Sequence, residues 1–387
     1  MKIAAIICEY NPFHNGHIYQ IKKTKEELNV DAVLAIMSGN FVQRGLPSAF
    51  SKYERAKIAC EYGCDLVIEL PIFSAIAPAD IFSKNAVNIL NKLNLINYLS
   101  FGSEDNLTTL KNTKKIMIEK KYLFDKLMKK NLSSGLSYSR SYANSFNELT
   151  ETSVMSKSNN ILAYNYLSAL AETKSDINAF SVQRLGPNYN ESASSEEFAS
   201  ASYIRKLIYE RKDVSKFLPK LPSENIIDFE KYFSYIKAIF LRENRYENYY
   251  EYNIDTINFI EKNIYDAKYY KDFIVNIGKK NFSKSYINRF LLSMLLNIHR
   301  DDISRNKDYD FIIPLCANEK GREILSEIKN CSQIKIISKY KDIYELSENS
   351  KLILNKMISL DKIYYFMKDM NVKDAYKINL LKAGKNF

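Results

Sequence analysis

The stretch "KIAAIICEYNPFHNGHIYQIKK", residues 2–23, joins an apolar run to a polar turn that carries two of the chain's three histidines. The run at residues 2–10 is continuous, as expected of a strand that is buried on both faces. Pro12 and Gly16 favour a sharp turn after it, and a helix is predicted from Gly16 to Leu28. The stretch therefore predicts a buried strand that leads directly into a helix.

The same alternation continues through the first two hundred residues. Further strands are predicted at residues 31–39, 65–71, 96–102 and 178–186. Helices are predicted at residues 51–63, 79–93, 159–170 and 200–208. Strands that alternate with helices are typical of a parallel sheet with helical crossovers. The predicted fold class is therefore α/β, a Rossmann-like doubly wound parallel sheet.

After about residue 213 the pattern changes and helices dominate. They are predicted at residues 227–242, 247–263, 267–278, 284–300 and 349–368. A smaller alternating piece, residues 310–338, lies among them. We therefore predict a sheet domain over residues 1–212, followed by a mostly α-helical domain over residues 213–387.

The composition of the 387 residues is that of a soluble globular protein, with 46% hydrophobic and 26% charged residues. No apolar run approaches the ~20 residues that a membrane span needs, and the N-terminal segment has no small-residue cleavage site. The five cysteines are odd in number and form no CxxC pair, although Cys60 and Cys64 are spaced for one helix face. Buried apolar thiols in a reducing compartment are favoured over a metal site there. We predict a cytoplasmic protein without membrane segments.

The net charge of +11 permits a polyanionic partner. The positive charge is densest in "KNTKKIMIEKKYLFDKLMKK", residues 111–130. This stretch contains eight lysines, and its acidic residues are Glu119 and Asp125. The apolar residues of this stretch are spaced as in a docked helix. A solvated helix face and a patch that contacts a phosphate backbone both fit this pattern.

His14 and His17 are the most informative residues of the opening stretch. Zinc-binding helices usually space their histidines i, i+4, whereas this pair is spaced i, i+3, and His299 is far away in the sequence. Two buried structural histidines remain an alternative. The pair nevertheless follows the first strand, at the sheet edge where doubly wound folds bind ligands. The start of the next helix offers free N–H groups and partial positive charge, so the position favours a phosphate site without a protein-bound metal.

A second motif follows at residues 200–205, "SASYIR", where Ser200 and Ser202 offer hydroxyls and Arg205 a cation. Together with "HNGH" at residues 14–17 it resembles the HIGH-type nucleotidyltransferase superfamily, whose members activate substrates with ATP by adenylyl transfer. The resemblance implies a nucleotidyltransferase-type sheet. It also implies catalytic roles for His14, His17 and Arg205, which would stabilise charge at the α-phosphate.

Further segments narrow the resemblance. "EYNPFHNGH", "SGNFVQRG", "DLVIELP", "FGSE", "SNNIL", "QRLG" and "ANEKGREIL" occur in this order, and the chain is similar to the tRNA(Met) cytidine acetate ligase family. That resemblance implies a ligase that converts acetate and ATP to acetyl-adenylate and diphosphate. The acetyl group then passes to the wobble cytidine of elongator tRNA(Met), leaving N(4)-acetylcytidine and AMP. The partners implied are acetate and the anticodon region of this tRNA. Mg²⁺ is compatible as the ordinary companion of ATP.

The resemblance also implies an ATP site. Its residues are Ile7, Cys8, Glu9, Tyr10, Asn11, Pro12, Phe13, His14, Asn15, Gly16, His17, Ile18, Tyr19, Gln20, Gly102, Asn160, Arg184, Ser200 and Ser202. Without the resemblance, Asn160 fits a helix cap and Arg184 a surface ion pair. Asn40, Gln43 and Arg44 follow the second strand, and we expect them to face the same cleft. They are suited to bind phosphate, acetate or the incoming nucleotide, and a polar loop is the alternative.

Two other functions share part of this evidence. An adenylyltransferase acting on a small phosphorylated metabolite, as in coenzyme A or NAD synthesis, carries both motifs but needs no large second domain. A nucleotide- or RNA-binding module without catalysis leaves the two motifs without a purpose. Acetate-dependent release of diphosphate distinguishes the ligase from the first alternative, and any turnover excludes the second.

Overall fold

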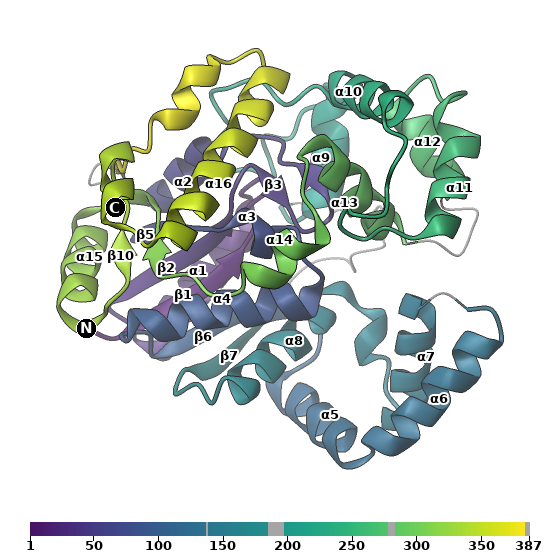
Figure 1. Cartoon of the computed structure of the whole chain (residues 1–387). Helices are drawn as coiled ribbons and strands as arrows, with labels where there is room; N and C mark the ends of the chain where they lie inside the picture. Colours follow the sequence, from purple (N-terminus) through teal and green to yellow (C-terminus); the bar gives the residue numbers. More distant parts are fainter. Residues whose placement is uncertain (137, 185–196, 278–282, 384–387) are drawn as a thin grey trace.

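The computed structural model describes residues 1–136, 138–184, 197–277 and 283–383. Its centre is a seven-stranded sheet in the order β11-β9-β5-β2-β1-β6-β7 (Figure 1). The five strands of the N-terminal half are β1 (Ile3–Cys8), β2 (Ala32–Ser38), β5 (Leu66–Leu70), β6 (Tyr98–Ser103) and β7 (Asn178–Gln183). All of their mutual pairings are parallel. The predicted doubly wound parallel sheet is confirmed.

The position of β1 decides where a ligand can bind. Residues 3–7 of this strand are buried, so the continuous apolar run fills the middle of the sheet. From β1 the chain first moves through β2 to β5, then crosses back to β6 and β7 on the other side. The direction of winding therefore reverses between β1 and β6. In open α/β sheets such a switch point forms a crevice at the carboxyl ends of the strands.

The C-terminal half also contributes to this sheet. β9 (Pro314–Ala317) pairs antiparallel with β5, and β11 (Leu381–Lys382) pairs parallel with β9. The sequence indicated only a small alternating piece here, so the addition of these strands to the main sheet was not predicted. Without β9, β5 would be an open edge of the sheet. Pairing with β9 gives the backbone groups of this edge hydrogen-bond partners.

Helices cover the sheet and form two outer groups (Figure 1). Those nearest the sheet are α1 (Asn15–Leu28), α2 (Lys52–Glu61), α3 (Ile72–Ala75), α4 (Ala79–Leu93), α8 (Ser158–Glu172), α9 (Ala201–Tyr209), α15 (Glu319–Cys331) and α16 (Glu348–Met367). One outer group is α5 (Leu107–Glu119), α6 (Lys121–Ser133) and α7 (Tyr138–Thr150). The other is α10 (Phe229–Arg242), α11 (Ile254–Ile264), α12 (Tyr270–Ile277) and α13 (Lys284–Leu295), and it is followed by α14 (Arg300–Arg305), which contacts α3.

The smaller elements are two short strand pairs and three 3₁₀ turns. The strands are β3 (Phe41–Val42) with β4 (Leu46–Pro47), and β8 (Phe311–Ile312) with β10 (Lys335–Ile336). The 3₁₀ turns are Val154–Ser156, Tyr340–Glu345 and Val372–Tyr376. None of the helices within the described ranges has both the length and the apolar character of a membrane span.

The main differences from the predicted helices lie in the outer groups. The basic stretch at residues 111–130 belongs to two helices, because the chain leaves helical geometry at Lys120, whose N–H still closes α5 on Ile116. The helix predicted from residue 247 begins at Ile254, and the one predicted to end at residue 300 ends at Leu295. The helical spacing of apolar residues continues past one end of each helix, so both predictions included neighbouring turn residues. Tertiary contacts, and not this spacing, set where the two helices begin and end.

Candidate active site

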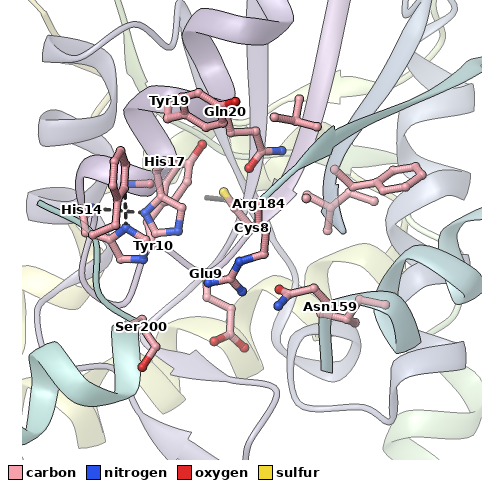
Figure 2. A pocket seen from close by; sticks show the side chains of 18 of the residues that line it. Cys8, Glu9, Tyr10, His14, His17, Tyr19, Gln20, Asn159, Arg184 and Ser200 are labelled. Carbon is pink, nitrogen blue, oxygen red and sulfur yellow. Dashed lines mark hydrogen bonds between the residues drawn. The ribbon is translucent and has the colours of Figure 1, made fainter. Parts of the chain in front are cut away.

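A cavity of about 230 Å³ lies at the carboxyl ends of β1, β6 and β7, at the switch point of the sheet (Figure 2). Most residues of the predicted ATP site line it. They are Ile7, Cys8, Glu9, Tyr10, Asn11, His14, Gly16, His17, Tyr19, Gln20, Gly102, Arg184 and Ser200. The structure thus brings residues from three strand ends and the starts of α1 and α9 to one place.

Aromatic packing stabilises the turn between β1 and α1. Tyr10 has a φ of 47°, in the left-handed region, and its side chain is only 1% exposed. Its ring contacts Phe13 and His17 edge-on, with centroids 4.8 and 4.7 Å away, and its hydroxyl lies 3.7 Å from Cys64 Sγ. A non-glycine residue keeps such a backbone conformation only where its surroundings impose it, so this turn is a rigid support.

Two backbone hydrogen bonds orient the histidines. The Gly16 N–H donates to His14 Nδ1, and the His14 N–H donates to His17 Nδ1, both at 3.1 Å. The two rings stack with centroids 3.7 Å apart and an interplanar angle of 21°. A neutral imidazole has one N–H, and an Nδ1 that accepts a hydrogen bond leaves that proton on Nε2. Both side chains are therefore set as Nε2–H donors.

Burial and neighbouring cations keep both rings neutral. Burial, followed by the charges of Arg184 and Arg205, lowers the pKa of His14 to about 3. Burial, followed by His14 and Arg184, lowers the pKa of His17 well below its ordinary value. Near neutral pH the pair consequently offers two hydrogen-bond donors and leaves the positive charge of the site to the arginines. This arrangement suits an anionic ligand.

The arginines reach the site from the other two elements. Arg184 follows β7 directly and lines the cavity, and Figure 2 shows it extending between the histidines and Asn159. Arg205 lies on α9 outside the cavity lining. Its Nη1 donates to the Asn11 carbonyl at 2.5 Å, so it holds the turn after β1 and acts on His14 through its charge.

The second motif begins α9 at the cavity. Ser200 is the N-cap residue, because its hydroxyl accepts the Tyr203 N–H at 3.2 Å. The Ser202 hydroxyl lies 3.2 Å from that of Ser200 and does not line the cavity. Ser200 and Ala201 do line it, so the N-termini of α1 and α9 both border the cavity. The partial positive charge of these two helix N-termini favours phosphate.

Asn160 supports the site without lining it. It is fully buried, and its Oδ1 accepts the N–H groups of Glu104 and Asp105 at 2.9 and 3.1 Å. Its Nδ2 donates to Asp105 Oδ2 at 2.6 Å. These bonds hold the loop that follows Gly102. The neighbouring Asn159 lines the cavity instead, and its Nδ2 donates to Glu104 Oε1 at 2.6 Å.

Asn40, Gln43 and Arg44 do not line the cavity. Asn40 is 1% exposed, and its Nδ2 donates to Asp361 on α16 at 2.8 Å, because the turn before β3 folds inward against the C-terminal half. The Gln43 N–H donates to the Glu9 carboxylate at 2.9 Å, which ties the β3–β4 turn to a cavity residue. Arg44 lies in this turn. The structure therefore does not bring these three residues to the cavity lining, and a substrate-binding role for them stays a prediction.

Pro12, Phe13, Asn15 and Ile18 lie within the same stretch but outside the cavity lining. Asn15 Nδ2 donates to the carbonyls of Glu197 and Lys216, at 3.1 and 2.9 Å, and so joins α1 to the segments on either side of α9. Nine lining residues were not predicted. They are Phe101, Asn159, Leu162, Tyr166, Val182, Gln183, Phe198, Ala199 and Ala201. Phe101 and Gln183 adjoin predicted residues, whereas the side of α8 that meets the cavity depends on tertiary packing.

No group of His, Cys, Asp or Glu within the described parts of the chain is arranged to hold a metal ion. Cys60 and Cys64 are both buried. Among the described residues that line the cavity, one carries a carboxylate, namely Glu9. The chemistry offered by the site is therefore that of neutral N–H donors, helix N-termini and arginine cations. Such groups bind phosphates and stabilise charge that develops on them.

The fold, the two motif helices and the cavity are those of a HIGH-type nucleotidyl transferase, and the family model described as HIGH Nucleotidyl Transferase matches residues 1–378. A tRNA(Met) cytidine acetate ligase of Clostridium perfringens (strain ATCC 13124) is 37% identical over 95% of this chain and 96% of that protein. One of Thermoanaerobacter sp. (strain X514) is 35% identical over 93% and 94%. The chain belongs to the tRNA(Met) cytidine acetate ligase family, which confirms the predicted family and enzyme class.

Solved structures agree with this assignment. Apo TmcAL of Thermotoga maritima matches with a TM-score of 0.88 and 25% identity, over 99% of this chain and 100% of that one. The same Thermotoga protein bound with alpha-thio ATP matches with a TM-score of 0.85 over the same shares. The similarity extends through the sheet and both outer groups of helices.

Proposed function

We propose that this chain is an ATP-dependent acetate ligase, which acetylates the wobble cytidine of elongator tRNA(Met) to N(4)-acetylcytidine and releases AMP and diphosphate. The observation that carries this proposal is the pair of neutral Nε2–H donors at the start of α1, beside Arg184 in the switch-point cavity. The names of the relatives support the tRNA substrate, and the Thermotoga structure with an ATP analogue supports ATP.

In the first step, an acetate oxygen attacks the α-phosphorus of ATP. The bond from that phosphorus to the bridging oxygen of diphosphate breaks, and diphosphate leaves with the electron pair. Acetate is an anion near neutral pH, so this step needs no base. It needs positioning and stabilisation of charge on the phosphoryl oxygens, which the Nε2–H groups of His14 and His17 and the charge of Arg184 provide.

In the second step, the exocyclic amine of cytidine attacks the acetyl carbonyl carbon. The bond from that carbon to the AMP oxygen breaks, AMP leaves with the electron pair, and the amine nitrogen loses one proton. Water competes for the same mixed anhydride, so the bound RNA has to cover the cavity. The wobble base must also leave its stack to reach the adenylate.

Mg²⁺ fits this scheme as the companion of the triphosphate. It is usually held by one or two carboxylates and the substrate phosphates, and Glu9, which lines the cavity, would supply such a carboxylate. As part of the proposal, residues 1–212 carry the ATP site and the helices beyond residue 213 contribute contacts to tRNA. Since the proposed substrate is a tRNA, a cytoplasmic location of the reaction is also part of the proposal.

The test is to incubate the full chain with ATP, labelled acetate and an anticodon stem-loop of elongator tRNA(Met), and to analyse the nucleosides by mass spectrometry. Labelled acetylcytidine, absent with the His17→Gln variant, is the expected result. Acetate-dependent release of diphosphate without labelled RNA would overturn the acceptor alone. Release that depends on a small phosphorylated metabolite instead of acetate would favour an adenylyltransferase.

A further inference from the structure

The α5–α6 pair, residues 107–133, holds a large share of the positive charge of the chain. It contains eight lysines, with Glu119 and Asp125 as its acidic residues, so its net charge is 8 − 2 = +6 out of +11 for the whole chain. Seven of the lysines are exposed, namely Lys111, Lys115, Lys120, Lys121, Lys126, Lys129 and Lys130. Among the described residues, one of these seven lysines forms an ion pair: Lys115 Nζ lies 3.9 Å from Glu119 Oε1, on the surface. Such a concentration of solvated cations favours a polyanion.

Large apolar side chains lie among these lysines. Ile118, Tyr122 and Leu123 are 67%, 81% and 47% exposed. The interior of the outer group is filled by other residues, including Phe124, whose ring contacts Tyr142 of α7 edge-on at 5.1 Å. The exposed residues are therefore not required for the core of this group. An exposed aromatic ring among cations is the arrangement that stacks on nucleic-acid bases.

A groove continues this surface toward the sheet. Lys111, Lys114, Lys115 and Ile118 of α5 form one wall of an open hollow of about 490 Å³, with Leu167 and Leu170 of α8 and the first residues of edge strand β7 opposite. Lys114 Nζ donates to the Leu167 carbonyl at 2.5 Å, which holds α5 on α8. The lining also includes Glu119, Ser175 and Asn178, so the groove offers three lysines to phosphates and polar groups to sugars.

The basic surface is rigidly connected to the cavity. The loop between β6 and α5 begins beside Gly102, which lines the cavity, and it is held by the hydrogen bonds from Asn159 and Asn160 to Glu104 and Asp105. Lys157 Nζ adds an ion pair to Asp105 at 3.0 Å. A molecule bound to α5 and α6 is consequently held at a defined position relative to the cavity.

We propose that the outer face of α5 and α6, together with the groove between α5 and β7, binds the backbone and unpaired bases of the tRNA while the target nucleotide enters the cavity. This inference rests on the proposed function and assigns it a second contact surface. The lysines contact phosphates and give affinity that is independent of sequence and sensitive to salt. Tyr122 stacks on an unpaired base.

The test measures binding of full-length tRNA(Met) transcript to the full chain over a range of salt concentrations. The variant carries Lys→Gln at Lys121, Lys126, Lys129 and Lys130, and its matched control carries Lys→Gln at four exposed lysines near β9 and β10. The control positions are Lys320, Lys329, Lys335 and Lys341. We expect at least about tenfold weaker binding for the variant, with the slope of log K against log salt reduced by roughly 0.9 for each lysine that contacts duplex phosphate. The control binds like the wild type.

A second variant tests stacking. Tyr122→Ala should weaken binding about tenfold without changing the salt slope, and Tyr122→Phe should restore it, because only the aromatic face is needed. Acetate-dependent exchange of diphosphate into ATP, which needs no RNA, should be unchanged in all of these variants. Absence of that exchange in the wild type would refute the proposed function while leaving the RNA measurement valid.

Two results would overturn the inference. One is equal tRNA affinity for the α6 variant and the matched control. The other is unchanged tRNA affinity in an α6 variant that has lost binding to vesicles of anionic lipid, which would assign the surface to a membrane instead.

Discussion

The imidazole rings of His14 and His17 stack 3.7 Å apart, and their Nδ1 atoms accept the backbone N–H groups of Gly16 and of the N-cap residue His14. One pair of side chains thereby caps a helix and presents two Nε2–H groups to the cavity. Since backbone bonds fix the tautomer and the ring orientation, the donors are in place before any ligand arrives. Donors that need no reorganisation stabilise developing charge most effectively.

Capping and catalysis can be separated at these positions. His14→Asn keeps a good N-cap residue, and His17→Gln keeps an acceptor for the His14 N–H at the third helical position. Both variants should retain their thermal stability. Each should lose acetate-dependent diphosphate exchange by about 100-fold or more, the cost of removing one preorganised donor. Exchange near the wild-type rate in either variant would exclude its histidine from charge stabilisation.

The low pKa of His14 makes stability dependent on pH. In the folded chain this pKa is about 3, against an ordinary value of 6.5, so below pH 6.5 the unfolded chain binds a proton that the folded chain does not. Stability is therefore lost as the pH falls from 6.5 toward 3, by about 2 kcal/mol at pH 5 from this residue. Urea unfolding at pH 7 and pH 5 measures the loss. His14→Asn should remove that part of it, and an identical loss in the variant would contradict the assignment.

Substitutions at Gly102 and Gly16 distinguish a methyl group that obstructs the ligand from one that displaces a side chain of the protein. A Cβ at Gly102 would lie 3.6 Å from Arg184 Cγ, an ordinary contact, so Gly102→Ala should fold normally. Because Gly102 lines the cavity, the added methyl should weaken ATP binding by about tenfold or more, roughly the effect of 1.4 kcal/mol. Equilibrium binding of ATP together with a melting curve tests both parts.

Gly16→Ala is the companion variant. Its Cβ would lie 2.9 Å from His14 Cε1, so the His14 ring has to move. We expect diphosphate exchange to fall more than ATP affinity does, because the added Cβ lies against the His14 ring and displaces that donor. Equal losses of exchange and affinity would show that the methyl acts on the nucleotide directly.

The buried ion pairs of Lys52 should dominate the attachment of α16. Lys52 Nζ lies 2.7 Å from Glu69 Oε2 on β5 and 2.6 Å from Asp361 Oδ2 on α16. Lys52→Met would leave two buried carboxylates without their cation, and we expect a loss of about 3–5 kcal/mol in the free energy of unfolding. Lys351→Met, which breaks a surface pair with Glu348, should cost less than about 1 kcal/mol. Similar urea midpoints for the two variants would show that the buried network contributes little.

The sequence predicted the site best where the signal was local. The β1–α1 junction, with its apolar run, turn residues and paired histidines, was recognisable from neighbouring residues. Asn160 was predicted as an ATP-site residue by resemblance, yet it holds the Glu104–Asp105 loop while Asn159 borders the cavity. The choice between these adjacent residues depends on how α8 is rotated against β6, which helical spacing alone does not determine.

The sequence by itself determined the parallel sheet, the succession of its first five strands along the chain and the two motifs at helix starts, because strand burial and helix starts depend on residues a few positions apart. Only the tertiary structure decided that β9 and β11 complete the sheet, that Arg184 reaches the two histidines, and that Lys52 pairs with Asp361 from 309 positions away. Such contacts follow from the path of the whole chain. Local periodicity does not determine that path. The charges around the site therefore depend on which distant segments pack together.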